Sequence, residues 1–181
     1  MDDHSVELDE ETEFYCTLLM FTNVTNTAEI REKLIAGKLQ CCIVKVALVT
    51  DAFQVIVAAN KAALNAKRNQ LITKNIYTEV LFTMSMSKNI SRSLIEFGIS
   101  DSDKDILVLL IYKLDEKEAV MKEILKSIKG EKVSISRLQE FTDANLVKKT
   151  YKINDEELQN SSLLDAVVSK ISCKEFISSK N

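Results

Sequence analysis

Two short apolar runs constrain the fold of this 181-residue chain more than any other feature of its sequence. Residues 14–21 and 105–112 each have the length of one β-strand and consist mainly of aliphatic and aromatic side chains. An unbroken apolar run indicates a strand that helices cover, whereas a strand with one wet face alternates apolar and polar residues. Residues 41–50 are predicted to form a third strand, and residues 131–136 to add a short edge strand.

The three glycines of the chain each follow an amphipathic stretch, so each predicts the end of a helix. The predicted helices span residues 27–36, 88–97 and 116–128, and they are followed by Gly37, Gly98 and Gly130. The apolar residue after Gly98 is typical of a left-handed helix terminus. We therefore expect a single-domain fold of mixed α/β (α+β) class. It should have a small, mostly antiparallel sheet of about four strands packed with six to eight helices.

The most distinctive segment covers residues 51–64. Asp51 is predicted to cap the start of a helix that is apolar on almost every side up to residue 59, which indicates a central place in the core. One helical face departs from that pattern because it carries Gln54, Lys61, Asn65 and Arg68. This face is either a solvated stripe on a buried helix or a contact for an anion or nucleic acid, and spacing alone favours neither interpretation.

Two later segments are also informative. Residues 75–84 are predicted to form a helix, although a strand also fits their composition, and Glu79 should cap nearby backbone or pair with Lys74. Residues 155–176 contain a C-terminal helix with one apolar stripe, made by Leu164, Val167, Val168 and Ile171. The spacing favours docking of this stripe onto the protein's own sheet, and the alternative is that part of it faces a partner.

The charge distribution divides the chain. Residues 1–13 hold seven acidic residues and no lysine or arginine, and they are predicted to form a disordered, solvated tail. The single domain should then cover residues 14–176, with a short tail at 177–181. The formal net charge of the whole chain is −3, yet residues 51–92 carry four more basic than acidic side chains. We therefore expect a locally basic face.

Several kinds of site are not expected. The only histidine is His4, inside the predicted tail, which argues against histidine acid-base chemistry in the folded part. Neither a phosphate-binding glycine loop nor a metal-binding spacing is present, so no catalytic residue, cofactor or metal is predicted. The cysteines lack a Cys-x-x-Cys spacing and are predicted to be buried apolar side chains: Cys16, Cys41, Cys42 and Cys173. With no apolar run of about 20 residues and no signal segment, the expected location is the cytoplasm, with access to the nucleus.

Residues 51–62, Asp-Ala-Phe-Gln-Val-Ile-Val-Ala-Ala-Asn-Lys-Ala, resemble the central helix of a known family. This family comprises the TPRKB-type, PRPK-binding subunits of the KEOPS (EKC) complex. The resemblance continues, in family order over about residues 14–176, through Thr78-Glu79-Val80, Asn89-Ile90-Ser91, Phe97-Gly98-Ile99-Ser100, Val147-Lys148-Lys149 and Leu163-Leu164-Asp165. Ala52 is a departure, since family members often have proline there, at the first turn of the helix.

The resemblance implies a single α/β domain without catalytic activity of its own. Such a subunit binds the small lobe of the PRPK-type atypical kinase and contacts other KEOPS subunits indirectly. The complex attaches threonylcarbamoyl to an adenosine beside the anticodon of certain tRNAs, and this subunit helps to capture the tRNA 3′ end. No membrane partner is implied.

On this interpretation, we predict tRNA contacts at Asn60, Lys61, Lys67, Arg68 and Lys74. Tyr77 is the nearest aromatic residue that could stack on a base. We predict kinase contacts at Leu164, Val167, Val168 and Ile171. The alternatives are a stand-alone RNA-binding domain, or a small cysteine-dependent transferase that uses Cys16 or Cys41.

Overall fold

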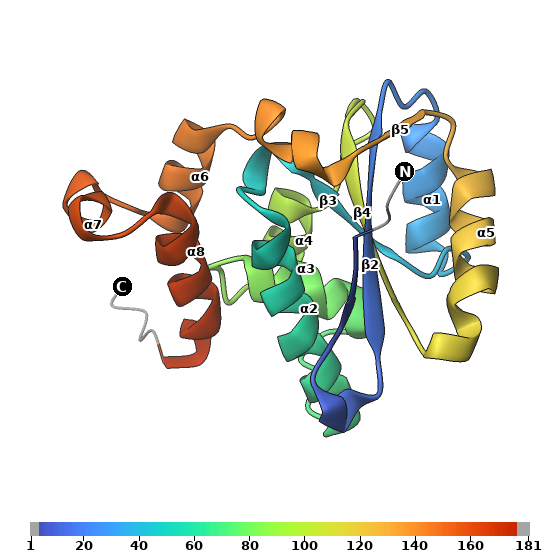
Figure 1. The fold of residues 1–181 in the computed structure, drawn as a ribbon, viewed down its shortest axis with the longest axis horizontal. Coiled ribbons are helices and arrows are strands. Elements are labelled where there is room, and N and C mark those ends of the chain that lie inside the picture. Colours follow the sequence, from blue (N-terminus) through green and yellow to red (C-terminus); the bar gives the residue numbers. More distant parts are fainter. Residues whose placement is uncertain (1–3, 177–181) are drawn as a thin grey trace.

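An open antiparallel sheet forms the centre of the molecule (Figure 1). The computed structural model describes residues 4–176. Within that range the strand order is β1-β2-β4-β3. Strands β1 and β5 both pair with the edge of β2 that faces away from β4, β1 along its first half and β5 along its last residues. The strands are β1 (His4–Glu7), β2 (Tyr15–Thr22), β3 (Cys42–Lys45), β4 (Ile106–Tyr112) and β5 (Glu131–Val133). The expected mixed α/β fold with a small antiparallel sheet is confirmed.

Helices cover both faces of the sheet (Figure 1). On one side lie α1 (Thr27–Ile35) and α5 (Lys117–Ser127). The other side is covered by α2 (Ala52–Lys67), α3 (Ile76–Met84), α4 (Ile90–Phe97), α6 (Ala144–Tyr151) and α8 (Leu163–Ser172), with α7 (Asp155–Asn160) beyond α8. Short 3-10 helices connect these elements: η1 (Glu10–Thr12), η2 (Val46–Leu48), η3 (Leu114–Glu116), η4 (Ile135–Glu140) and η5 (Lys174–Phe176).

Strand β4 explains why the apolar runs are unbroken. All of its residues are buried, and alternate side chains enter two separate cores. Leu107 and Leu109 join the core that contains α2, whereas Val108 and Leu110 join the core that contains Ile30 of α1. A strand that is covered on both faces needs an apolar side chain at every position, as the sequence predicted.

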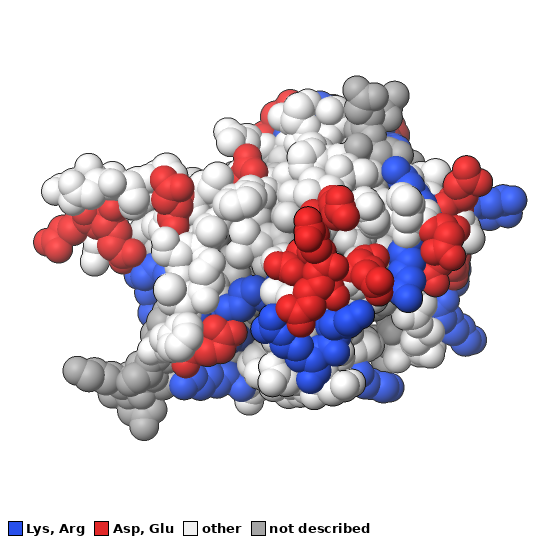
Figure 2. All heavy atoms as spheres, turned by 60° about the horizontal axis from the view of Figure 1, so that its bottom comes forward, with Lys and Arg blue, Asp and Glu red and all other residues white. Residues whose placement is uncertain are grey.

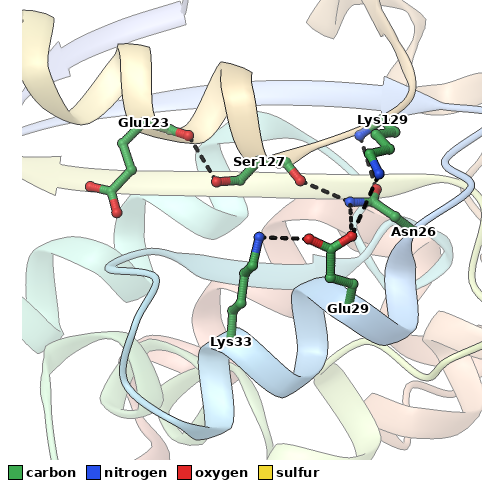
Figure 3. A network of polar contacts seen from close by, with 6 residues as sticks. All are labelled: Asn26, Glu29, Lys33, Glu123, Ser127 and Lys129. Carbon is green, nitrogen blue, oxygen red and sulfur yellow. Dashed lines mark hydrogen bonds and ion pairs between the residues drawn. The ribbon is translucent and has the colours of Figure 1, made fainter.

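A network of polar contacts fixes α1 against the end of α5 (Figure 3). The Asn26 side chain, just before α1, donates to the carbonyl oxygen of Ser127 and accepts from the backbone N–H of Lys129, both at 2.9 Å. Glu29 of α1 also accepts from Asn26, at 3.3 Å, and pairs with Lys33 at 2.7 Å. These contacts use backbone groups at the end of α5 that the helix itself leaves unpaired.

Three predictions about local structure need correction. Residues 4–13 are not a solvated tail: β1 pairs with β2, and the buried Leu8 enters the core. The third strand is shorter than predicted, because the chain turns into η2 after Lys45. Gly98 has an extended conformation with φ of −73°, so the helix before it has no left-handed terminus. The predicted tail at 177–181 lies outside the described residues.

Candidate partner-binding surfaces

The polar stripe predicted on α2 runs from a buried residue, Gln54, to a half-exposed one, Arg68. Gln54 is fully buried, and its amide nitrogen donates to the carbonyl oxygen of Leu48 at 3.0 Å and to the hydroxyl of Tyr151 at 3.1 Å. Its amide oxygen accepts from the backbone N–H of Thr50 at 2.8 Å. Buried polar groups must be paired in this way. Gln54 therefore joins α2 to α6 and is not available to a ligand.

Lys61 connects α2 to the C-terminal end of α8. Its Nζ donates to the carbonyl oxygens of Ile171 and Ser172, at 3.1 and 3.0 Å, and forms an ion pair with Glu175 at 2.9 Å. The last carbonyl groups of a helix lack intrahelical partners and carry partial negative charge, so a cation at this position stabilises α8. Lys61 therefore has a structural function, whatever else it binds.

Lys67 and Arg68, at the end of α2, are paired with the segment that was predicted to be a tail. The two carboxylate oxygens of Glu11 accept from the Arg68 guanidinium at 3.0 and 2.6 Å, a bidentate contact. Glu13 forms a longer ion pair with Lys67, at 3.4 Å. The hydrogen bond from Arg68 lowers the pKa of Glu11, and the same bond raises the pKa of Arg68. Both basic side chains are about half exposed.

The remaining predicted RNA residues are Asn60, in α2, and Lys74, which follows α2. The Asn60 amide oxygen accepts from the backbone N–H of Asp9 at 2.7 Å. Lys74 is exposed, in the loop before α3, and forms no ion pair with any residue that the structure describes. Figure 2 shows basic and acidic side chains side by side near the middle of one face of the molecule. Acidic side chains therefore pair with two of the basic residues predicted to contact RNA, Lys67 and Arg68.

Glu79 holds the loop that carries Lys74 without pairing with that lysine. The carboxylate is buried and accepts from the backbone N–H groups of Ile72 and Thr73, at 3.1 and 2.8 Å. Asn65 of α2 donates to its other oxygen at 3.3 Å. Of the two partners predicted for this carboxylate, nearby backbone is therefore the correct one.

A hollow of about 590 Å³ lies between α2, β1 and the end of α8. Phe53, Ile56 and Val57 of α2 form its apolar wall, and Phe53 is 52% exposed. The remaining lining residues are Glu7, Leu8, Asp9, Asn60, Lys61 and Ser172. Neither this hollow nor the position of the acidic residues beside α2 was predicted from the sequence. The apolar Val6 and Leu8 within the acidic run were the available signal, because their spacing of two is that of a strand.

The aromatic residue predicted to stack on a base is not free to do so. Tyr77 is partly buried, and its hydroxyl donates to the carbonyl oxygen of Ile111 at 3.3 Å. Burial raises the pKa of Tyr77 to about 12. Phe53 is instead the exposed aromatic on the face of α2 that also carries Asn60 and Lys67.

Helix α8 presents only part of the predicted kinase-binding stripe. Val167 and Ile171 are fully buried in the protein's own core, so neither is available to a partner at the surface. Leu164 and Val168 are half-buried and can contact one. The core covers only part of the stripe. One side of α8 therefore docks onto the domain, and Leu164 and Val168 form a partly exposed apolar ridge beside it.

Cys16, Cys41 and Cys42 are buried as predicted and do not resemble nucleophiles, whereas Cys173 is exposed, contrary to the prediction. Burial raises the pKa of Cys16 to about 11 and also raises the pKa values of Cys41 and Cys42, which disfavours the reactive thiolate. In residues 4–176, no group of three or more His, Cys, Asp or Glu side chains is arranged to hold a metal ion. No helix in the same range is long and apolar enough to cross a membrane.

Comparison with known proteins identifies the family. The model of the family described as kinase binding protein CGI-121 matches residues 21–175. The chain is 34% identical over 163 residues to the EKC/KEOPS complex subunit TPRKB of Danio rerio, which covers 90% of this chain and 93% of that protein. It is 27% identical over 163 residues to the EKC/KEOPS complex subunit cgi121 of Schizosaccharomyces pombe, and the match covers 88% of this chain and 92% of that protein. It is also 27% identical over 152 residues to the EKC/KEOPS complex subunit CGI121 of Candida glabrata, and this match covers 82% of the chain and 85% of that protein. The chain therefore belongs to the CGI-121 family of kinase-binding proteins, as its resemblance to the TPRKB-type subunits indicated.

Proposed function

We propose that this protein is a non-catalytic subunit of a KEOPS-type complex that binds and supports a PRPK-type kinase and helps to recruit tRNA. The observation that carries this proposal is the family match over residues 21–175. The relatives named above are EKC/KEOPS complex subunits, and the family is named for kinase binding. Burial raises the pKa values of Cys16 and Cys41, which argues against the alternative of a cysteine-dependent transferase that uses either thiol.

The kinase contact that we propose is the outer ridge of α8, formed by Leu164 and Val168. Both side chains are apolar and half-buried, and Lys61 holds the end of the helix that carries them. A partly exposed apolar ridge on a fixed helix is the kind of surface that a partner groove covers.

Co-purification with the PRPK-type kinase of the same organism tests this contact. Val168→Glu and Leu164→Glu should abolish a stable complex on size exclusion, because each inserts a charge into an apolar contact. The matched control is Leu125→Glu on α5, whose side chain is 44% exposed on the opposite layer of the molecule. Val168→Glu protein that is folded and still binds the kinase would remove α8 from the proposal.

The tRNA contact that we propose is the end of α2, with Lys67, Arg68 and the exposed Lys74 near the phosphates and Asn60 as a polar contact. Charge combined with an aromatic side chain is how proteins hold single-stranded ends, and Phe53 is the aromatic available on this face. The ligand is the tRNA 3′ end, delivered for threonylcarbamoyladenosine formation beside the anticodon. This role fits a protein in the cytoplasm and nucleus.

Binding of a tRNA transcript, with and without its four 3′ nucleotides, tests this second contact. Lys67→Glu/Arg68→Glu should weaken binding of the full transcript strongly, whereas Lys126→Glu/Lys122→Glu on α5 should not. Removal of the 3′ nucleotides should lower the affinity of the wild-type protein. If charge reversal at residues 67 and 68 leaves the affinity unchanged, the RNA surface lies elsewhere.

A further inference from the structure

The acidic turn, residues 8–13, is held in one shape. Its ends are joined by a hydrogen bond from the backbone N–H of Leu8 to the carbonyl oxygen of Phe14, at 2.9 Å. Within it, the Asp9 carboxylate accepts from the backbone N–H of Glu11 at 3.0 Å, and the Thr12 hydroxyl donates to the Asp9 carbonyl oxygen at 2.7 Å. Leu8 and Thr12 are buried. The turn is therefore a fixed part of the fold.

This fixed turn aims two carboxylates at the end of α2. Glu11 contacts the Arg68 guanidinium through both oxygens, and Glu13 contacts Lys67. A third link joins the two elements, from the backbone of Asp9 to the Asn60 side chain. An exposed ion pair has little effect when both side chains move freely, but a bidentate pair presented by an ordered turn is better defined. The turn occupies the same nitrogen atoms that a phosphate would contact.

We propose that Glu11 and Glu13 are specificity-determining residues that stand in for phosphates at the end of α2. A ligand contacts the paired nitrogen atoms of Lys67 and Arg68 only by displacing both carboxylates. A single phosphate replaces one carboxylate and remains next to the other, which repels it. A strand with successive phosphates replaces both. Lys74 is exposed and forms no ion pair with a described residue, and Glu79 links its loop to Asn65 of α2, so it offers such a strand a further contact. The protein should therefore select a nucleic acid strand over free nucleotides. That this strand is tRNA rests on the proposed function.

The competition predicts a change in both affinity and salt dependence. When a phosphate contacts the wild-type protein, cations leave the RNA. The carboxylate that the phosphate displaces then attracts cations from solution, so the net release of cations is small. Without the carboxylates, each phosphate contact should increase the slope of log affinity against log salt by up to about 0.7. Removing two competing pairs should also tighten RNA binding by about 3- to 30-fold at low salt.

Glu11→Gln/Glu13→Gln in the full chain is the variant that tests this proposal, because glutamine keeps the size and polarity of each side chain. The matched control is Asp101→Asn/Glu140→Gln, which changes the net charge equally and breaks the exposed ion pairs with Arg31 and Arg137 instead. The probes are a tRNA transcript and adenosine monophosphate, each titrated at several salt concentrations. Lys67→Glu/Arg68→Glu reports separately on the RNA surface itself.

Tighter RNA binding and a steeper salt slope in Glu11→Gln/Glu13→Gln, with the control unchanged, would support the proposal. Binding that appears only in this variant would support it too. If both double variants change affinity and slope equally, the effect is general charge and the proposal is overturned. If Lys67→Glu/Arg68→Glu weakens RNA binding while Glu11→Gln/Glu13→Gln equals wild type, the proposed function stands and only this inference fails. If no variant binds RNA, or none differs from wild type, both this inference and the tRNA contact of the proposed function fail.

Discussion

The Nζ of Lys61 lies 3.1 Å from the carbonyl oxygen of Ile171, so one lysine joins the helix proposed to bind RNA to the helix proposed to bind the kinase. The lysine side chain is only 21% exposed, and its contacts are to the end of α8. A variant at this position therefore changes both surfaces at once. Loss of RNA binding in such a variant would not identify an RNA contact, and for this reason residues 67 and 68 are the better test.

We expect Lys61→Met to lower the free energy of unfolding by about 1–2 kcal/mol, because the last carbonyl groups of α8 lose a charged donor. Urea denaturation measures this difference. Lys126→Met, at an exposed position on α5, should change stability by less than about 0.5 kcal/mol. Equal stability of the two variants would show that Lys61 does not hold α8.

Gln54→Leu should lower the free energy of unfolding by about 2–4 kcal/mol. The leucine side chain remains apolar and buried, but four groups lose their partner: the Leu48 carbonyl, the Thr50 amide, the Thr50 hydroxyl and the Tyr151 hydroxyl. Thermal or urea denaturation measures the loss. Gln159→Leu, on the exposed surface of α7, should stay within about 0.5 kcal/mol of wild type, and a similar value for Gln54→Leu would contradict the assigned hydrogen bonds.

Gly98 and Gly37 should respond differently to alanine. A Cβ at Gly98 would lie 2.4 Å from the carbonyl oxygen of Leu94, so something must move, and we expect a cost of about 2–4 kcal/mol. Gly37 has a φ of +68° with open space around it, and Gly37→Ala should cost about 1–2 kcal/mol, the strain of the left-handed conformation alone. Urea denaturation compares them. A larger loss at Gly37 would contradict the role assigned to the close contact at Gly98.

The sequence predicted elements better than it predicted contacts. The apolar runs at β2 and β4 and the helix at α2 follow from local periodicity, and the structure has them where they were expected. Glu11 was misinterpreted because a run of acids repels itself unless cations lie opposite. Those cations are 57 residues away in the sequence, at Arg68. Val167 was assigned to a partner although the protein's own core buries it, because spacing defines a helical face but does not show which part of the fold covers that face.

Lys174 gives the structure a pH dependence. Its Nζ donates to the carbonyl oxygen of Phe82 and lies 3.4 Å from the centroid of that ring. Burial lowers the pKa of Lys174 from 10.5 to about 8, and the neighbouring Lys61 adds to this effect, while Glu79 and Glu175 oppose it. Between about pH 8 and 10.5 the unfolded chain therefore binds more protons at this residue than the folded protein does.

The contribution of Lys174 to stability should accordingly rise with pH across that window and be smallest below about pH 8, where the charged amine is buried. We expect the free energy of unfolding of the wild type, relative to Lys174→Met, to increase as the pH is raised from about 7.5 to about 10. Urea titrations of both proteins at several pH values measure the difference. Ionisable groups that titrate alike in both proteins contribute equally to the two free energies of unfolding and therefore do not affect the difference. A difference that is flat or falls with pH would mean that the Lys174 amine is as well solvated in the folded protein as in the unfolded chain.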